Sequence, residues 1–206
     1  MRICWLFRFL PEAAVRTHGK QLVLAALFTG ALVCGNAQTA ADPALLSKAS
    51  TGDAAAQVMV GEGYAAGNGQ ARTAKQLAED YRQAAEWYRK AAAQGNIAGE
   101  MHLAALYRDG KGVARDMAQA AGWYRKAAEH GDATAQATLG VLYSMGQGVE
   151  HNDVEAYYWL DLAASVKGSN QEKYAANRQM IGTHITADEL EAVQERVAQW
   201  KAAHPR

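Results

Sequence analysis

The stretch Glu86–Asn96 reads EWYRKAAAQGN, and Gly122–Asp132 repeats it almost unchanged as GWYRKAAEHGD, 36 residues further along the chain. Trp87, Trp123 and Trp159 keep the same spacing. So do five further pairs: Gly95 and Gly131, Tyr107 and Tyr143, Gly110 and Gly146, Gly112 and Gly148, and Val113 and Val149. A fixed period of this length indicates a protein built from stacked structural repeats.

Each repeat is predicted to contain two helices, because two sets of start and stop signals fall within it. The first helix begins after an Asp or Asn whose side chain can accept hydrogen bonds from free backbone N–H groups. It ends at a glycine that can take the left-handed cap conformation. The starts are Asp53, Asn96 and Asp132, and the ends are Gly67, Gly110 and Gly146.

The second helix is predicted to begin near Asp116 or Asn152 and to close at a glycine, as at Gly95 and Gly131. Each of these starts is followed three residues later by Gln or Glu, as in a capping box. No stretch alternates polar and apolar residues for long enough to predict strands. The fold class is therefore expected to be all-α.

An earlier and looser copy of the repeat begins at Gly52, and it is offset by 43 residues rather than 36. The seven extra residues fall within 70–80, where Thr73 and Gln76 form a capping-box pattern. Seven residues make about two helical turns. The second helix of this first unit is therefore predicted to be longer at its N-terminal end, with Trp87 on its usual face.

The apolar sides of the two helices need neighbours to cover them. Small residues recur on the first helix, and a stripe of Ala, Trp and Tyr recurs on the second. The small residues are Ala56, Gly99 and Ala135, and then Gly61, Ala104 and Gly140. One hairpin cannot bury such a stripe alone, but a stack of three can, which is the principle of a solenoid.

Within Trp87–Ala120, the motif WYRKAA is followed by Gly95, Leu103, Tyr107 and the motif GKGV. This order resembles the Sel-one-like repeat, a relative of the tetratricopeptide hairpin. The resemblance covers about residues 44–166. It implies a right-handed helical-hairpin solenoid of about three 36-residue repeats, in which the first helices of successive repeats line a concave surface.

The repeat pattern stops after Ala164, and two further helices are predicted to begin at Ser169 and Thr186, each with Glu three residues later. On the last of them, one stripe holds Leu190, Val193, Val197 and Trp200. We interpret residues 167–206 as a helical cap that covers the open face of the last repeat. The alternative is that the last helix is an amphipathic segment that binds a partner.

Residues 1–37 are predicted to be a signal peptide. Basic residues precede the apolar run Leu22–Cys34, and the small residues Gly35 and Ala37 then fit a cleavage site. The run has 13 residues and is too short to span a bilayer, which needs about 20. We therefore expect an exported bacterial protein, periplasmic or secreted, whose repeat solenoid occupies 38–166. In the alternative, an uncleaved leader tethers the chain to the membrane.

The composition of the mature chain excludes several kinds of chemistry. Cys4 and Cys34 both lie in the leader, so no disulfide, thiol nucleophile or thiolate metal site is expected. The leader also holds four of the 21 Lys and Arg residues and one of the 21 Asp and Glu residues. A net charge near −3 with interspersed signs gives no electrostatic reason to expect binding to nucleic acid or anionic lipid.

No catalytic, cofactor-binding or metal-binding residue is predicted. The histidines outside the leader form no zinc motif; they are His102, His130, His151, His184 and His204. Ser165 and Lys167 form a Ser-x-Lys pair at a helix end, with no partner triad in view. Some secreted members of the family that the chain resembles are linked to β-lactams, which implies one alternative function, a hydrolase of cell-wall or β-lactam substrates.

A protein or peptide partner is expected on the surface of the first helices, where side chains change from one repeat to the next. The equivalent positions are Met59, His102 and Thr138; Glu62, Ala105 and Val141; and Ala65, Arg108 and Ser144. The predicted partner contacts are Met59, Glu62, His102, Arg108, Thr138, Val141 and Ser144. The predicted function is a monomeric protein-interaction scaffold of the bacterial envelope, without a cofactor. A membrane-tethered assembly factor is the alternative if the leader is kept.

Overall fold

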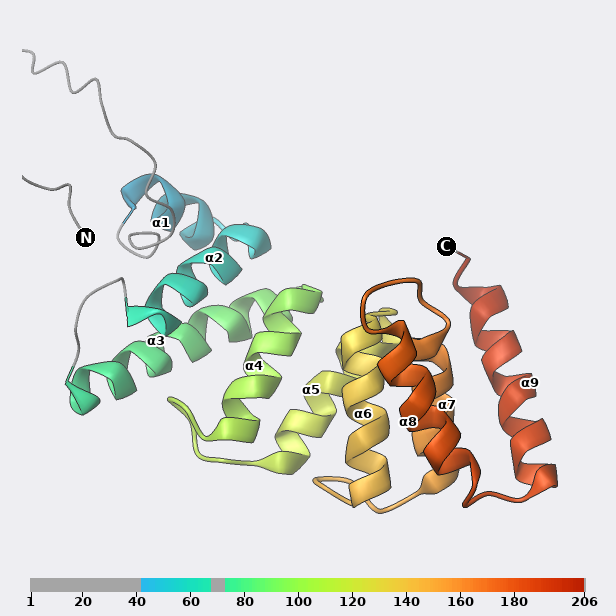
Figure 1. Ribbon diagram of the computed structural model, residues 1–206. Coiled ribbons are helices and arrows are strands. Elements are labelled where there is room, and N and C mark those ends of the chain that lie inside the picture. Colours follow the sequence, from blue (N-terminus) through green and yellow to red (C-terminus); the bar gives the residue numbers. More distant parts are fainter. Residues whose placement is uncertain (1–41, 68–72, 206) are drawn as a thin grey trace, which may run out of the picture. The chain divides into compact units, whose positions relative to one another are not determined.

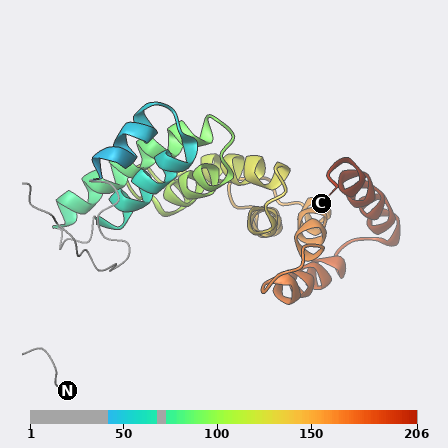
Figure 2. The ribbon, with the colours of Figure 1, turned by 90° about the horizontal axis from the view of Figure 1, so that it is seen from above.

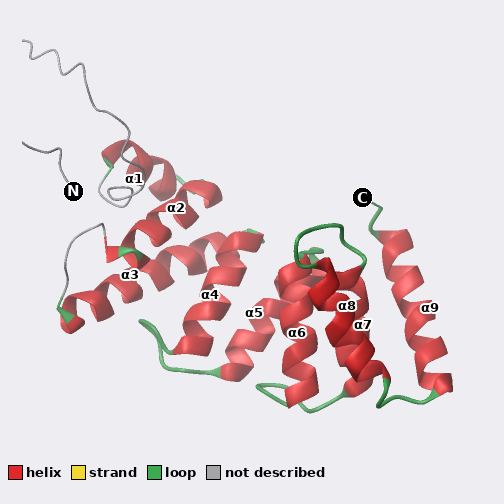
Figure 3. Cartoon of the chain, viewed as in Figure 1, coloured by secondary structure: helices red, strands yellow, loops and turns green. Residues whose placement is uncertain are grey.

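The computed structural model describes residues 42–67 and 73–205. The predicted signal peptide lies outside this part of the chain, so its boundary at residue 37 stays a prediction. The described residues form nine helices and no strand, which confirms the all-α class (Figure 1, Figure 3). The helices are α1 (Pro43–Ser50), α2 (Ala54–Ala65), α3 (Ala74–Ala92), α4 (Ile97–Asp109), α5 (Met117–Glu129), α6 (Ala133–Met145), α7 (Asp153–Ala164), α8 (Gln171–Gly182) and α9 (Ala187–Ala203).

Helices that follow one another in the sequence pack against one another. From α1 to α8 each helix packs on the next, and α9 packs on α7. Figure 2 shows the same succession of helices from above. The pairs α2–α3, α4–α5 and α6–α7 are the three predicted hairpins, and α3 has 19 residues, so the predicted extension of this helix is confirmed.

The predicted caps of the first helices are confirmed. The side chains of Asp53, Asn96 and Asp132 each accept a hydrogen bond from the backbone N–H three residues on, at 2.9, 3.0 and 2.7 Å. Gly110 and Gly146 close α4 and α6 in the left-handed conformation. In the first unit α2 ends slightly earlier, at Ala65, with Ala66 as its cap.

The capping boxes are only partly confirmed. Thr73 and Thr186 form complete boxes at the starts of α3 and α9. At α5 and α7 the side chains of Asp116 and Asn152 cap the helix, but their backbone N–H groups donate to carbonyl oxygens of the preceding helix, Tyr107 and Tyr143, at 2.9 and 3.1 Å. The backbone N–H of each cap residue thus already has an acceptor, so the Gln or Glu three residues later is not needed to accept its hydrogen bond.

Two helix starts differ from the sequence-based expectation. Ser169 was expected to cap α8, but the helix begins at Gln171 after Asn170, whose side chain makes no capping bond. Helix α1 was not expected at all. It begins with Asp42 as N-cap and Pro43 at the first helical position, and its buried Ala49 packs on α2.

The small residues of the first helices face the second helices, as expected. A Cβ atom built at Gly99 would lie 2.8 Å from Cβ of Ala91 on α3, and one at Gly140 would lie 2.8 Å from Cγ of Leu160 on α7. Real Cβ atoms do not approach so closely, so the helices pack at this distance only because the side chain is missing. The periodic small residues thus set the spacing between neighbouring helices.

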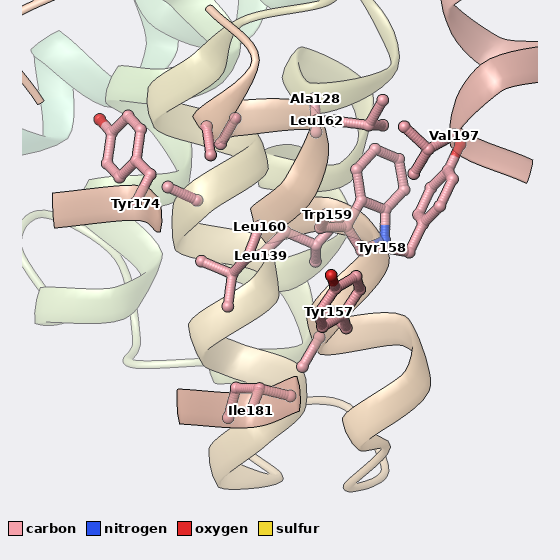
Figure 4. Packing of buried hydrophobic residues seen from close by; sticks show 14 of the residues in the cluster. Ala128, Leu139, Tyr157, Tyr158, Trp159, Leu160, Leu162, Tyr174, Ile181 and Val197 are labelled. Carbon is pink, nitrogen blue, oxygen red and sulfur yellow. The ribbon is translucent and has the colours of Figure 1, made fainter. Parts of the chain in front are cut away.

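The last repeat is covered by α8 and α9, and its sequence differs accordingly. Lys90 and Lys126 lie over the rings of Trp87 and Trp123, at 4.0 and 3.9 Å. The equivalent Leu162 is fully buried. Figure 4 shows Leu162 and Trp159 on the side of α7 that faces Val197 of α9. Val193 and Val197 of the predicted stripe are buried, so in this structure that stripe packs on the repeat.

A charge reversal accompanies this covering. Arg125 donates to the hydroxyl of Tyr143 in the next helix, at 2.6 Å. The equivalent residue in the last repeat is Asp161, which accepts a hydrogen bond from Arg178 of α8 at 2.5 Å and lies 3.9 Å from Lys201 of α9. In the second repeat, the residue at this position therefore binds the first helix of the next repeat. In the last repeat, the residue at the same position binds both C-terminal helices.

Candidate partner-binding surface

The residues predicted to contact a partner lie on three helices, and we call this set the first-helix surface. Met59 and Glu62 lie on α2, and His102 and Arg108 on α4. The α6 members are Thr138, Val141 and Ser144. All seven are at least partly exposed, and Met59 is 46% exposed although it is apolar.

Two of these residues meet across the boundary between repeats. His102 Nε2 lies 3.2 Å from Oε1 of Glu62, so α2 and α4 are bridged on this surface. The imidazole of His102 also stacks on Tyr88 of α3, with ring centroids 4.7 Å apart and an angle of 18° between the planes. His102 is therefore held in place by a carboxylate and by an aromatic ring. The contact between His102 and Glu62 is exposed and contributes at most about 1 kcal/mol to stability.

Arg108 lies on the same helix as His102, six residues later, and it contacts the tyrosine of α5 that is equivalent to Tyr88. Its Nη1 donates to the hydroxyl of Tyr124 at 3.2 Å, and its Nε donates to Asp109 at 2.8 Å. The bond to Asp109 raises the pKa of Arg108 and lowers the pKa of the Asp109 carboxyl. Part of the hydrogen-bonding capacity of Arg108 is thus used within the chain, and the rest of its side chain faces solvent.

The tyrosines beneath these residues belong to the repeated motif. Tyr88 and Tyr124 are both buried, and burial raises the pKa of each hydroxyl above its ordinary value. Both hydroxyls therefore stay neutral at physiological pH and can donate or accept a hydrogen bond. In the sequence these two tyrosines belong to the stripe of Ala, Trp and Tyr that recurs on the second helices. Nothing in the sequence indicates that they support the variable residues His102 and Arg108.

At the third repeat the surface ends in a pocket of about 290 Å³ between α6 and α8. Thr138 and Val141 of the predicted set lie in its wall. The other lining residues are Thr134, Ala137, Asn170, Lys173, Tyr174 and Asn177. Only Thr138 and Val141 of the eight lining residues belong to the predicted set. Four of the other six come from the α8 segment, in which nothing indicates which face of the repeats it covers.

A larger pocket of about 730 Å³ lies outside the predicted surface, beside the loop between α6 and α7. Its polar lining includes Arg125, Tyr143, His151 and Glu155. Arg125 and Tyr143 already bond to each other, and Glu155 pairs with Arg196 at 2.8 Å. Arg125, Tyr143 and Glu155 therefore serve contacts between helices, and His151 lies 3.3 Å from Asp153 at the start of α7.

The Ser165 hydroxyl, the one candidate nucleophile, donates to the carbonyl of Leu162 at 2.7 Å, as is usual for a serine at a helix end. Ser165 also borders a pocket of about 370 Å³ with Trp200, Lys201 and His204. In residues 42–67 and 73–205 no His, Cys, Asp and Glu side chains gather in threes in a way that could hold a metal ion. No helix in the same part of the chain is long and apolar enough to cross a membrane.

These observations define a helical-hairpin repeat protein. A family model described as Sel1 repeat matches residues 54–96, 97–132 and 133–165, so the chain belongs to the Sel1 repeat family. The first matched segment contains the predicted seven-residue extension. A comparison with curated proteins found no match.

Two solved bacterial structures are similar to this chain. One is c5321, a protective antigen of uropathogenic Escherichia coli strains that displays an SLR fold, with 29% identity and a TM-score of 0.55 over 77% of this chain. This chain covers only 40% of the length of that antigen. The other is a Sel1 repeat protein from Oxalobacter formigenes, with 32% identity and a TM-score of 0.54, covering 63% of this chain and 92% of the other.

Proposed function

We propose that this protein is an exported scaffold of the bacterial envelope, which binds a protein or peptide segment on the first-helix surface. The observation that carries the proposal is the contrast between repeated and variable side chains. The repeated tyrosines Tyr88 and Tyr124 are buried, and the residues above them, His102 and Arg108, differ from repeat to repeat. On a surface of this kind the repeated residues hold the same backbone in place, and the variable residues determine which partner is bound.

The chemistry of the surface fits an extended polypeptide segment. It offers an exposed apolar side chain at Met59, a polar pair at Glu62 and His102, and a cation at Arg108. The pocket beside Val141 could hold one further side chain. An alternation of apolar and polar contacts along a row of helices suits a peptide better than a small molecule, which is usually bound in one enclosed cavity.

Replacing His102 and Arg108 together by alanine is expected to weaken partner binding by at least about tenfold, because two contacts of about 1 kcal/mol or more each are removed. Residues 38–206 would be immobilised and exposed to envelope extract, and retained proteins would be compared between the wild type and the double variant. Tyr88 and Tyr124 stay in place, so circular dichroism should show an unchanged fold.

The matched control removes the same side-chain types elsewhere. Arg82→Ala with His204→Ala takes away an exposed Arg and an exposed His that lie off the first-helix surface. This control should retain the partner as the wild type does. If both double variants retain it equally, binding on the surface around His102 and Arg108 is contradicted.

The leader is expected to be removed, leaving Gln38 as the first residue. The apolar run Leu22–Cys34 is long enough for a signal peptide and too short for a stable membrane span. Intact-mass measurement of the protein purified from its native envelope would show the mass of residues 38–206. The mass of the full chain would instead support the tethered assembly factor.

We propose a binding role and not a catalytic one, with no cofactor. The Ser165 hydroxyl is engaged with Leu162, and the residues around it belong to the contact between α7 and α9. Turnover of a chromogenic β-lactam that disappears in Ser165→Ala would contradict this assignment and favour the hydrolase.

A further inference from the structure

At one buried position the second repeat carries a carboxyl group where the other two repeats carry an amide. Glu100 lies one turn into α4 and is 2% exposed. Its Oε2 has no hydrogen-bond partner among the described residues. A buried carboxylate without a donor costs several kcal/mol, so this atom needs an explanation.

The other two repeats show what this position normally does. Gln57 and Gln136 stand at the equivalent positions, 43 residues before and 36 residues after Glu100. The side-chain amide of Gln57 donates to the carbonyl of Ala49 at 3.0 Å, and that of Gln136 donates to the carbonyl of Ala128 at 3.1 Å. In both cases a buried N–H ties the first helix of a repeat to the end of the preceding helix.

The acceptor lies eight residues before the glutamine in both cases, and by the same spacing we infer that the carbonyl of Ala92, at the end of α3, is the one that faces Glu100. An ionised carboxylate has no proton to donate, and it would repel this oxygen. We propose that in mildly acidic conditions Glu100 of the folded chain is a protonated carboxylic acid that donates to the Ala92 carbonyl, which makes the contact between α3 and α4 sensitive to pH. Ionisation of Glu100 turns this hydrogen bond into a repulsion and loosens the contact.

The other carboxyl oxygen of Glu100, Oε1, also lacks the hydrogen bond that its counterpart in the first repeat accepts. In the first repeat Oε1 of Gln57 accepts a hydrogen bond from Gln94 at 2.9 Å. The residue equivalent to Gln94 is His130, whose Nε2 lies 3.8 Å from Oε1 of Glu100. Two amides are thus replaced by a carboxyl group and an imidazole ring, and 3.8 Å is too long for a hydrogen bond.

The charges around Glu100 act in both directions. From α5, Lys126 and the C-cap residue His130 favour the ionised form, and Glu129 favours the acid. On α3 the nearby cations are engaged elsewhere: Lys90 lies over Trp87, and Arg89 pairs with Glu86 at 2.7 Å. On α4 itself, His102 pairs with Glu62.

Burial outweighs these charges and raises the pKa of Glu100 above its ordinary 4.5. A carboxyl whose pKa is higher in the folded state than in the unfolded chain stabilises the fold fully at low pH. This contribution is lost as the pH rises from about 4.5 through the raised folded pKa. The contact between α3 and α4 is therefore tighter in mildly acidic than in neutral conditions.

Glu100→Gln tests the proposal, because it restores the amide that the other repeats carry. The melting temperature of the variant is expected to exceed that of the wild type by about 2–4 °C at about pH 8, and by clearly less at about pH 5. The reverse change, Gln57→Glu, should make the first repeat pH-sensitive in the same way.

A direct readout is the titration of the Glu100 side-chain carboxyl carbon by NMR, with Glu100→Gln to assign the signal. A midpoint above the ordinary value of 4.5 is the expected result. A midpoint at or below it would overturn the proposal. So would a variant that is less stable than the wild type at about pH 8, since that is the result expected if Glu100 is ionised and paired with His130.

Discussion

Replacing Leu162 by lysine is expected to lower the free energy of unfolding by about 4 kcal/mol or more, although lysine is the residue that the two earlier copies of the motif carry at this position. Leu162 is fully buried in the cluster that α7 forms with α9. The substitution removes a core side chain and places an ammonium group where no water reaches it. Chemical denaturation at neutral pH measures the change.

The matched control is the converse substitution one repeat earlier. Lys126 is exposed and lies over Trp123, so Lys126→Leu should change stability by less than about 1 kcal/mol. A third variant, Leu162→Ala, removes the same packing without adding a charge and is expected to cost about 3 kcal/mol. If lysine at position 162 costs no more than alanine, α9 does not cover this position in solution.

This contrast shows how far the sequence predicts the fold. The period of 36 residues, the Asp and Asn caps and the breaker-free extension of α3 were all readable, because each depends on local chemistry that recurs. The change from WYRKAA at Trp87 to WLDLAA at Trp159 carried the further information that the last repeat is covered. Leucine replaces lysine where α9 packs, and Asp161 replaces arginine where Arg178 approaches.

The start of the repeat stack was less readable. Helix α1 has only eight residues, and its single buried residue Ala49 gives no periodic pattern. The Asp-Pro pair at Asp42 and Pro43 is a recognised start signal, since Pro at the first helical position costs no hydrogen bond. That signal could have predicted the helix. The position of α8 could not be predicted in the same way, because its N-terminus lacks a side-chain cap.

The candidate surface was predictable only in outline. Comparing equivalent positions predicted which residues vary, and the structure brings Glu62 and His102 into contact. The partners that hold them come from other helices: Tyr88 on α3 supports His102, and Tyr124 on α5 supports Arg108. Such contacts depend on how each helix packs on the next, which periodicity alone does not specify.

Replacing Gly148 by alanine is expected to cost about 3 kcal/mol of stability, which is more than a positive φ alone requires. Gly148 has a φ of 72°, and a left-handed conformation costs an alanine about 1–2 kcal/mol. In addition, a Cβ atom there would overlap the carbonyl of Met117, the first residue of α5, and would lie 2.8 Å from the nitrogen of Ala118. Because these are backbone atoms, the loop itself must move.

Gly146→Ala separates strain from overlap. Gly146 has a similar φ of 64°, but its nearest neighbour would be Cβ of His151 at 3.4 Å, which is an ordinary contact. This variant should therefore cost only about 1–2 kcal/mol. Gly112 repeats the arrangement of Gly148, since a Cβ atom there would meet the carbonyl of Tyr81 on α3. Denaturation of all three variants should place Gly112→Ala beside Gly148→Ala, because the loop that follows each first helix is fixed against the preceding second helix. Equal losses for Gly146→Ala and Gly148→Ala would show that conformational strain alone explains these glycines and that the loops do not lie on the helices.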